Sequence, residues 1–131
     1  MSTVVRSLPF VLAALALSSP LSALAAECPA PQRQQGEQVF ARDCAACHSA
    51  QASGPALMGP NLHGVIGRVP GSVAGANYSQ AMKAQQAAWT AQTVEAFIEH
   101  PQVAVPGTYM PYAGMPNAQE RQAVSCFLAG G

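Results

Sequence analysis

The chain has 131 residues, enough for one small domain. Only 9% of the residues are charged, the formal net charge is +0, and half of the residues are hydrophobic, many of them alanine. A neutral chain of this kind has no basic surface for phosphates, which argues against nucleic-acid binding, and it predicts no long-range charge steering of a partner.

The N-terminal segment has the pattern of a secretory signal peptide. Arg6 supplies a positive charge, the run from Leu8 to Leu17 is apolar, and Ala23-Leu24-Ala25 resembles a cleavage site. A membrane anchor is the alternative, but this run is shorter than the ~20 residues that span a bilayer. Glu27 stands where a lipid anchor on Cys28 would require a small residue. We therefore expect an exported, periplasmic protein with no stable membrane insertion.

Removal of residues 1–25 would leave a single domain at residues 26–131. Its five basic side chains oppose six carboxylates, a net charge of −1. A chain of this length is near the low end for a self-sufficient apolar core. A large bound cofactor would supply the missing bulk.

The first expected helix leads into the most informative motif of the chain. Residues 29–34 suggest an extended lead-in, and from about Gln35 the apolar positions Val39, Phe40, Cys44 and Cys47 recur at helical spacing. The pattern predicts an all-α fold with three main helices and a short one, and no strand is evident.

The sequence Cys44-Ala45-Ala46-Cys47-His48 has the spacing of a covalent c-type haem attachment site. Two thiols add to the haem vinyl groups as thioethers, and the adjacent imidazole reaches the iron from one face. The alternatives are a thioredoxin-like redox pair and half of a zinc site. A redox pair should follow a β-strand, and none precedes Cys44.

The other two cysteines, Cys28 and Cys126, lie near the two ends of the mature chain. In an exported protein they form either a disulfide or two unpaired thiols. A four-thiolate zinc site built from all four cysteines is a further alternative, but it leaves His48 unexplained.

The remainder of the chain alternates loops with short helices. Residues 49–75 are rich in Gly, Pro, Ser and Asn, and a loop of this length in a small domain suggests that it wraps a ligand. A helical turn is expected near residues 79–86. Thr90 resembles the N-cap of a helix that Pro101 stops, with Val94, Phe97 and Ile98 inward.

A second loop, residues 106–116, precedes the last helix. Asn117 and Glu120 resemble a capping box, and Val124, Phe127 and Leu128 would face inward.

Haem iron also needs a sixth ligand or an open site, and that choice decides function. The candidates in the mature chain are Met58, Met82, Met110, Met115, His63 and His100. Met110 is favoured because the prolines of Pro106-Gly107-Thr108-Tyr109-Met110-Pro111 restrict the backbone. The spacing alone leaves the other methionines open.

Taken together, these segments resemble the class I c-type cytochromes. The matching segments are CAACH, GPNLHGVIGR, Tyr78, Trp89, PGTYMPYAG and ERQAVSCFL, which together span about Gly36 to Leu128. CxxCH is shared by many haem proteins, whereas its combination with the other segments is far more specific. The resemblance implies one covalently bound haem c with iron.

The resemblance also assigns roles to individual residues. His48 would be the proximal and Met110 the distal iron ligand, and the Pro60 carbonyl would hold the orientation of His48. Arg68, Tyr78 and Trp89 would contact one haem propionate and Thr108 the other. The cofactor-binding residues would be Cys44, Cys47, His48, Pro60, Arg68, Tyr78, Trp89, Thr108, Met110 and Tyr112.

Three features depart from the family pattern. Phe97 replaces a tyrosine whose hydroxyl often reaches the ligand sulfur, so a reduction potential cannot be carried over. Tyr109 replaces a lysine, and the basic ring that relatives use to dock partners is missing. Cys28 and Cys126 are unusual, although the terminal helices of the family cross, which makes a bridge plausible in geometry.

The predicted function is therefore that of a monomeric, soluble, monohaem electron carrier, not an enzyme. It would serve an oxidase, reductase or dehydrogenase in a respiratory chain, docking through an apolar surface at the exposed haem edge. The alternative is a haem protein that binds small ligands or handles peroxide, with a labile distal methionine.

Overall fold

The computed structural model describes residues 28–131, and the predicted signal peptide, residues 1–25, lies outside the described residues. The described chain folds into five helices, with no strand among them, and long loops follow α1 and α4. The all-α prediction is confirmed. The helices are α1 (Ala30–Asp43), α2 (Gln80–Lys83), α3 (Ala91–Glu99), α4 (Pro101–Ala104) and α5 (Ala118–Ala129).

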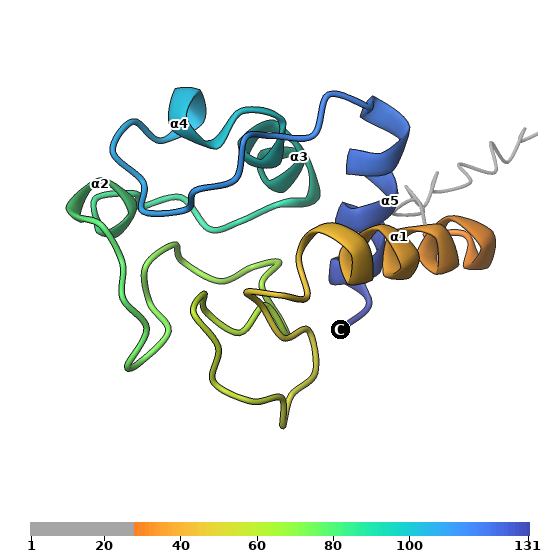
Figure 1. Ribbon diagram of the computed structural model, residues 1–131, viewed down its shortest axis with the longest axis horizontal. Helices are drawn as coiled ribbons and strands as arrows, with labels where there is room; N and C mark the ends of the chain where they lie inside the picture. Colours follow the sequence, from red (N-terminus) through yellow and green to blue (C-terminus); the bar gives the residue numbers. More distant parts are fainter. Residues whose placement is uncertain (1–27) are drawn as a thin grey trace, which may run out of the picture.

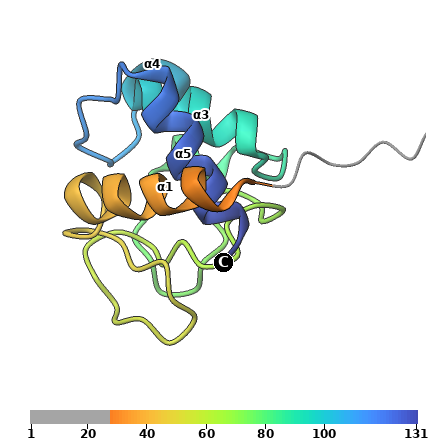
Figure 2. The same ribbon diagram turned by 90° about the vertical axis from the view of Figure 1, so that its right-hand side faces the viewer.

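The first and last helices cross in contact, and α3 packs against α5 (Figures 1 and 2). The crossing is close because Gly36 presents no side chain: a Cβ there would overlap the carbonyl oxygen of Ala123. The rings of Phe40 and Phe127 meet at the same crossing, with centroids 5.4 Å apart. The expected packing of the first helix against the last is present.

Helix α1 starts earlier than the sequence suggested. Residues 30–34 are helical, so the expected extended lead-in at residues 29–34 is wrong. Pro31 lies in the first turn, where its missing N–H costs no hydrogen bond, and the glutamines and arginine that follow favour helix. The helix ends at Asp43, and Cys44 caps it with its N–H bonded to the Phe40 carbonyl.

The remaining helices begin at polar caps. Ser79 accepts a hydrogen bond from the Met82 amide at the start of α2, which is shorter than the predicted turn. Thr90 caps α3 in a reciprocal pair with Thr93. Asn117 caps α5 as expected, but the carboxylate of Glu120 bonds Arg42 and does not complete the expected capping box. Helix α4 was not predicted; the proline that stops α3 also opens this single turn, where proline is tolerated.

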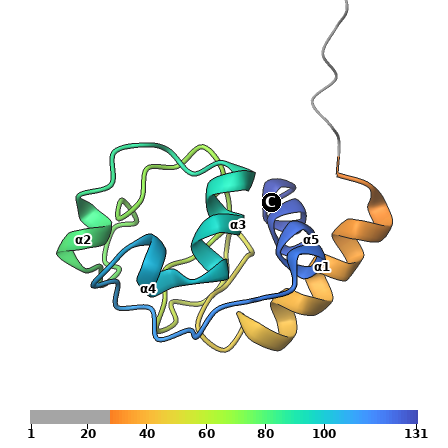
Figure 3. The same ribbon diagram turned by 90° about the horizontal axis from the view of Figure 1, so that it is seen from above.

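The core lies where α1, α3 and α5 meet the loops. Its buried members are Val39, Phe40, Val65, Val94, Met115, Val124 and Leu128. Helix α2 stands at the opposite end of the molecule from α1 and α5 (Figure 3). The chain between these ends encloses a cavity instead of a continuous core.

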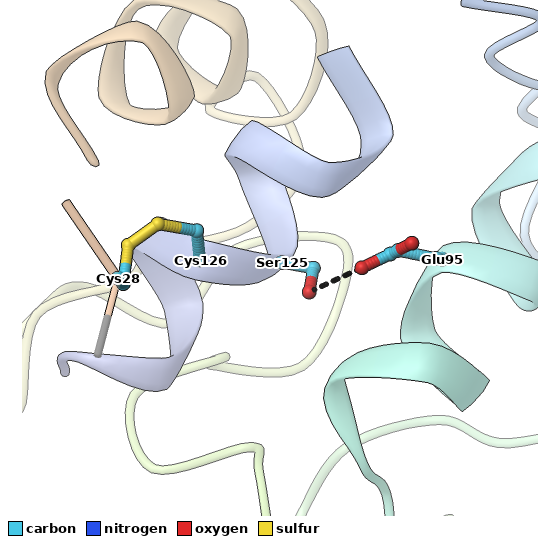
Figure 4. The surroundings of a disulfide bond; sticks show 4 residues. All are labelled: Cys28, Glu95, Ser125 and Cys126. Carbon is cyan, nitrogen blue, oxygen red and sulfur yellow. Dashed lines mark hydrogen bonds between the residues drawn. A yellow bond between two sulfur atoms is a disulfide. The ribbon is translucent and has the colours of Figure 1, made fainter. Parts of the chain in front are cut away.

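Two contacts fix α5 further, as Figure 4 shows. Cys126 lies on α5 and is joined to Cys28, just before α1, as a disulfide, with the Cα atoms 5.5 Å apart. The Ser125 hydroxyl donates to Glu95 of α3 at 3.1 Å. The N-terminal end of the described chain and helix α3 are therefore both fastened to α5.

Every helix within residues 28–131 is too short or too polar to span a bilayer.

Candidate functional site: an apolar cavity with a CxxCH wall

A cavity of about 540 Å³ occupies the middle of the described chain. Two long segments line it. In the view of Figure 1, residues 44–79 lie in the lower part of the molecule and residues 105–117 lie above them. All ten residues predicted to bind the cofactor line this one cavity: Cys44, Cys47, His48, Pro60, Arg68, Tyr78, Trp89, Thr108, Met110 and Tyr112. The fold thus gathers at one place residues that span nearly seventy positions of the sequence.

The CxxCH motif forms a turn directly after α1. The amides of Cys47 and His48 donate to the Cys44 carbonyl at 3.0 and 2.9 Å. This turn brings both thiols and the imidazole to the same wall of the cavity. Neither cysteine takes part in a disulfide, and both are partly buried. Burial, together with the nearby charge of Asp43, raises the pKa of the Cys44 thiol to about 11.

The imidazole of His48 is held from behind by the next loop. Its Nδ1 lies 2.7 Å from the Pro60 carbonyl oxygen. A carbonyl can only accept, so Nδ1 carries the proton and Nε2 keeps its lone pair. Burial lowers the pKa of His48, although the Pro60 hydrogen bond opposes this effect. The ring is therefore neutral near pH 7, which is the form that binds a metal.

Met110 reaches the cavity from the second long loop. Its amide approaches the Thr108 hydroxyl oxygen at 3.4 Å, and its carbonyl accepts a hydrogen bond from the Gln102 side chain at 3.2 Å. Gln102 also donates to the Thr108 carbonyl at 3.0 Å. Sequence reasoning missed Gln102, because its role depends on α4, which left no recognisable local signal.

The other candidates for a sixth ligand divide into two groups. Met58, Met82 and Met115 also line the cavity, whereas His63 and His100 do not. Met115 is only 2% exposed and belongs to the core cluster. Met58 precedes Gly59, which lies against the His48 ring, and so stands on the histidine side.

Arg68, Tyr78 and Trp89 line another part of the cavity. Backbone hydrogen bonds tie two of them together, since the Trp89 amide donates to the Arg68 carbonyl at 2.9 Å. The Arg68 guanidinium donates to the carbonyls of Asn61 and His63 at 2.7 and 2.9 Å. Burial raises the pKa of Tyr78, which keeps its hydroxyl protonated and able to donate.

Tyr112 connects the second loop to the end of α1. Its hydroxyl donates to Asp43, next to Cys44, at 3.5 Å. Hydrogen bonds from Arg42 hold the pKa of the Asp43 carboxyl below its usual value, and burial raises the pKa of Tyr112.

The rest of the cavity wall is apolar. Much of it comes from inward positions that the helical periodicity predicted, and Phe97 of α3 packs on Trp89 with ring centroids 5.3 Å apart. The apolar lining residues include Leu62, Val65, Met82, Val94, Phe97, Ile98, Met115, Val124 and Leu128. Of these, Leu62 and Val65 were not predicted as site residues, since loop residues show no period, whereas Met82 and Met115 were among the candidates for the sixth ligand.

These features suit a haem. The volume lies within the roughly 300–1,000 Å³ of typical cofactor sites, and the wall is apolar with few polar groups, as such sites require. Two free thiols stand on the same wall as a neutral imidazole whose free nitrogen can bind iron. By contrast, no three His, Cys, Asp or Glu side chains within residues 28–131 gather as a metal site, so the four-thiolate zinc alternative is wrong.

An all-α chain that wraps an apolar cavity and lines it with CxxCH has the architecture of a c-type haem protein. The family model named Cytochrome c matches residues 34–130. Among relatives, cytochrome c of Chlamydomonas reinhardtii is 38% identical over 79% of this chain and 92% of its own length. Cytochrome c of Kluyveromyces lactis is 34% identical over 76% of the chain and 94% of its length. A bacterial relative, "Cytochrome c-type cyt cy" of Rhodobacter capsulatus, is 40% identical over 71% of the chain and 46% of its own length.

The chain belongs to the cytochrome c family. It carries covalently bound haem c with iron, and it is a monohaem electron carrier that exchanges electrons with redox partner proteins.

Proposed function

We propose that the protein carries single electrons through a haem ligated by His48 and Met110 and attached through Cys44 and Cys47. The observation that carries this proposal is the shared cavity: both ligand candidates line it, and the His48 Nε2 is left free by the Pro60 hydrogen bond. A thioether ligand raises the reduction potential and suits electron transfer.

Bound haem c supplies one iron that alternates between the ferric and ferrous states. The chain fixes the conditions for that exchange. Pro60 orients the proximal imidazole, and Gln102 with Thr108 holds the Met110 segment. Fixed ligands reduce the rearrangement that accompanies a change in oxidation state. The apolar wall keeps water from the iron.

The propionates would lie at the polar part of the cavity. We propose that Arg68, Tyr78 and Trp89 receive one and Thr108 the other, because each of them brings an N–H or O–H donor to a mostly apolar wall. Thr108 is buried, at 7% exposure, which suits contact with a buried carboxylate. Tyr112 would stand beside the haem edge near Cys44.

We further propose that residues 1–25 are a signal peptide and that residues 26–131 form the haem domain of a monomeric periplasmic protein. The apolar run and the Ala-Leu-Ala pattern support export, and an oxidising compartment suits the Cys28–Cys126 disulfide. N-terminal sequencing of the purified protein tests this: a start at Ala26 is expected, and an intact Met1 would contradict export.

The ligation is tested by the absorption spectrum of the reduced protein with and without carbon monoxide. We expect a low-spin spectrum that carbon monoxide does not change, because Met110 occupies the sixth position. Ready formation of the carbonyl complex in the unaltered protein would instead support the alternative function, a haem protein that binds ligands or handles peroxide.

Met110→Ala and Met58→Ala form a matched pair for the same experiment. Met110→Ala should bind carbon monoxide and lower the reduction potential by at least about 0.1 V, within the roughly 0.8 V over which axial ligands set haem potentials. Met58→Ala removes an equal thioether from an exposed position and should change neither property. The reverse pattern would assign the sixth ligand to Met58.

A further inference from the structure

We infer that Gln102 is a positioning residue for the sixth ligand: its side-chain amide controls how readily the Met110 loop opens and lets another ligand reach the iron. The inference rests on the proposed ligation by Met110 and concerns the regulation of that ligation. Gln102 lies on α4 and does not line the cavity. It can therefore act on the iron only through the segment that carries Met110.

Residues 109–114, which include the distal ligand, have few backbone restraints. Before them, the Thr108 amide donates to the Val105 carbonyl at 3.0 Å. After them, the Met115 amide donates to the Ile98 carbonyl at 2.8 Å. Between these two bonds, residues 109–114 form no backbone–backbone hydrogen bond with any other part of the described chain. Side chains must therefore hold this segment in place.

The shortest side-chain hydrogen bonds to residues 108–114 come from Gln102. Its Nε2 donates to the carbonyls of Thr108 and Met110, at 3.0 and 3.2 Å. A side-chain amide nitrogen carries two hydrogens, and the two carbonyls use both. The Met110 amide lies farther from its acceptor, the Thr108 hydroxyl, at 3.4 Å, and the Tyr112 hydroxyl lies 3.5 Å from its acceptor. Gln102 therefore holds the segment more closely than these other side chains do.

Gln102 stands on a firm support. Pro101 and Val105 of the same turn are buried, and the Val105 amide donates to the Pro101 carbonyl at 2.9 Å. Gln102 itself is exposed, so water competes for its hydrogen bonds and their net contribution is modest. Loss of these bonds should open the segment locally and leave the rest of the fold intact.

The oxidation state decides where this control matters. A thioether ligand raises the reduction potential, so by linkage it must bind ferrous iron more tightly than ferric iron. The bond to Met110 is therefore weaker in the ferric protein. The hydrogen bonds from Gln102 then supply a larger share of what keeps the segment closed, so the effect of Gln102 should be measured in the ferric protein.

Titration of the ferric holoprotein with imidazole, at about pH 8, where most imidazole is neutral, tests the inference. In this exchange the bond from the iron to the Met110 sulfur breaks, a bond to an imidazole nitrogen forms, and no electron is transferred. Gln102→Ala removes both hydrogen bonds and should tighten the apparent binding of imidazole about tenfold. An unchanged affinity would overturn the inference.

Gln86→Ala is the matched control. Gln86 is also exposed, and its Nε2 also donates to a backbone carbonyl, that of Ala84, at 3.4 Å. This hydrogen bond lies outside the Met110 loop, and Gln86 does not line the cavity. The affinity for imidazole should stay within about twofold of that of the unaltered protein. A tightening equal to that of Gln102→Ala would contradict a specific role for Gln102.

Gln102→Glu separates hydrogen bonding from packing. The glutamate side chain has nearly the size of glutamine, but its ionised carboxylate has no hydrogen to donate to the two carbonyls. This variant should bind imidazole at least as tightly as Gln102→Ala does. An affinity equal to that of the unaltered protein would show that only the shape of the side chain matters, which overturns the inference.

Urea unfolding of the same ferric variants gives a readout of global stability. The midpoints should change little, because both hydrogen bonds are near the surface. A lower midpoint with unchanged imidazole affinity would mean that Gln102 only stabilises the fold, against the inference.

The carbon monoxide spectrum of the unaltered reduced protein tests the proposed ligation itself. Formation of the carbonyl complex there would contradict ligation by Met110. Resistance to carbon monoxide, together with an unchanged imidazole affinity in Gln102→Ala, would contradict the role of Gln102 alone.

Discussion

Gly59 lies so close to His48 that a Cβ at the glycine would stand 2.6 Å from Nδ1 and 2.8 Å from Nε2 of the imidazole. Gly59→Ala should therefore displace the ring or break its hydrogen bond to Pro60. We expect weaker binding of the proximal ligand, seen as a partly high-spin reduced spectrum and a lower yield of holoprotein. A spectrum identical to that of the unaltered protein would show that the ring has room to move.

Gly75→Ala is the matched control for that substitution. Gly75 has φ +76°, and a Cβ there meets nothing within 4 Å. The change should cost about 1–2 kcal/mol of stability through backbone strain alone. Its haem spectrum should not change, so the two variants separate a steric effect on His48 from a general loss of stability.

The Cys28–Cys126 disulfide closes almost the whole described chain, with a sequence separation of 98. Replacing both cysteines with serine should lower the free energy of unfolding by about 2–4 kcal/mol, because a long closed loop restricts the unfolded chain. Urea unfolding of the holoprotein measures the loss. The haem spectrum should be unchanged, since neither cysteine lines the cavity.

A thiol count on the unaltered holoprotein in denaturant is the companion measurement. No free thiol is expected, because Cys44 and Cys47 are committed to the haem and the other pair to the disulfide. Two reactive thiols would show that Cys28 and Cys126 stay reduced, and the serine variant should then unfold like the unaltered protein.

Local chemistry made the site predictable. The CxxCH motif brings its own geometry, because the turn that follows α1 places two thiols and an imidazole together. The inward faces of α3 and α5 follow from the helical period of residues such as Val94 and Leu128. Met110 could be favoured only from the prolines of its loop and from the family resemblance. The wall of the cavity opposite His48 is formed by residues that are far apart in the sequence, so no local pattern predicts it.

Other parts of the fold depended on contacts that sequence does not display. The early start of α1 was missed because Pro31 and its polar neighbours resembled a linker, whereas packing near Arg33 and Gly130 supports the helix. Helix α4 was missed because a single turn has no period. Gln102 lies on this helix and holds the Met110 loop, so its role was not predicted either.

The contact between α1 and α5 depends on Gly36. A Cβ there would overlap the Ala123 carbonyl and stand 2.8 Å from the Cβ of Phe127. Gly36→Ala should force the helices apart and lower the free energy of unfolding by about 1–3 kcal/mol, in spite of the better helix propensity of alanine. Gln35→Ala, at the exposed neighbouring position, should be nearly neutral or slightly stabilising in the same urea titration. Equal stability of the two variants would contradict the tight crossing.

The end of α1 should give the protein a small, defined dependence on pH. Hydrogen bonds from Arg42, at 2.8 Å to each Asp43 oxygen, hold the pKa of this carboxyl below its usual 3.8. The folded protein therefore binds fewer protons at Asp43 than the unfolded chain does. The stability from this group is present above about pH 4 and is lost as the pH falls through the lowered pKa.

Asp43→Asn tests that dependence through thermal unfolding at a series of pH values. Near neutral pH the variant should melt lower by about 3 °C or less, because the ion pair is largely exposed to solvent. The difference in Tm should shrink as the pH falls below about 4, where the native carboxyl also becomes neutral. Glu37→Gln changes an exposed carboxyl that has no ion pair or side-chain hydrogen bond within residues 28–131 and should show no such convergence. A constant difference down to about pH 2.5 would mean that Asp43 acts through its shape and its contact with Tyr112, not through its charge.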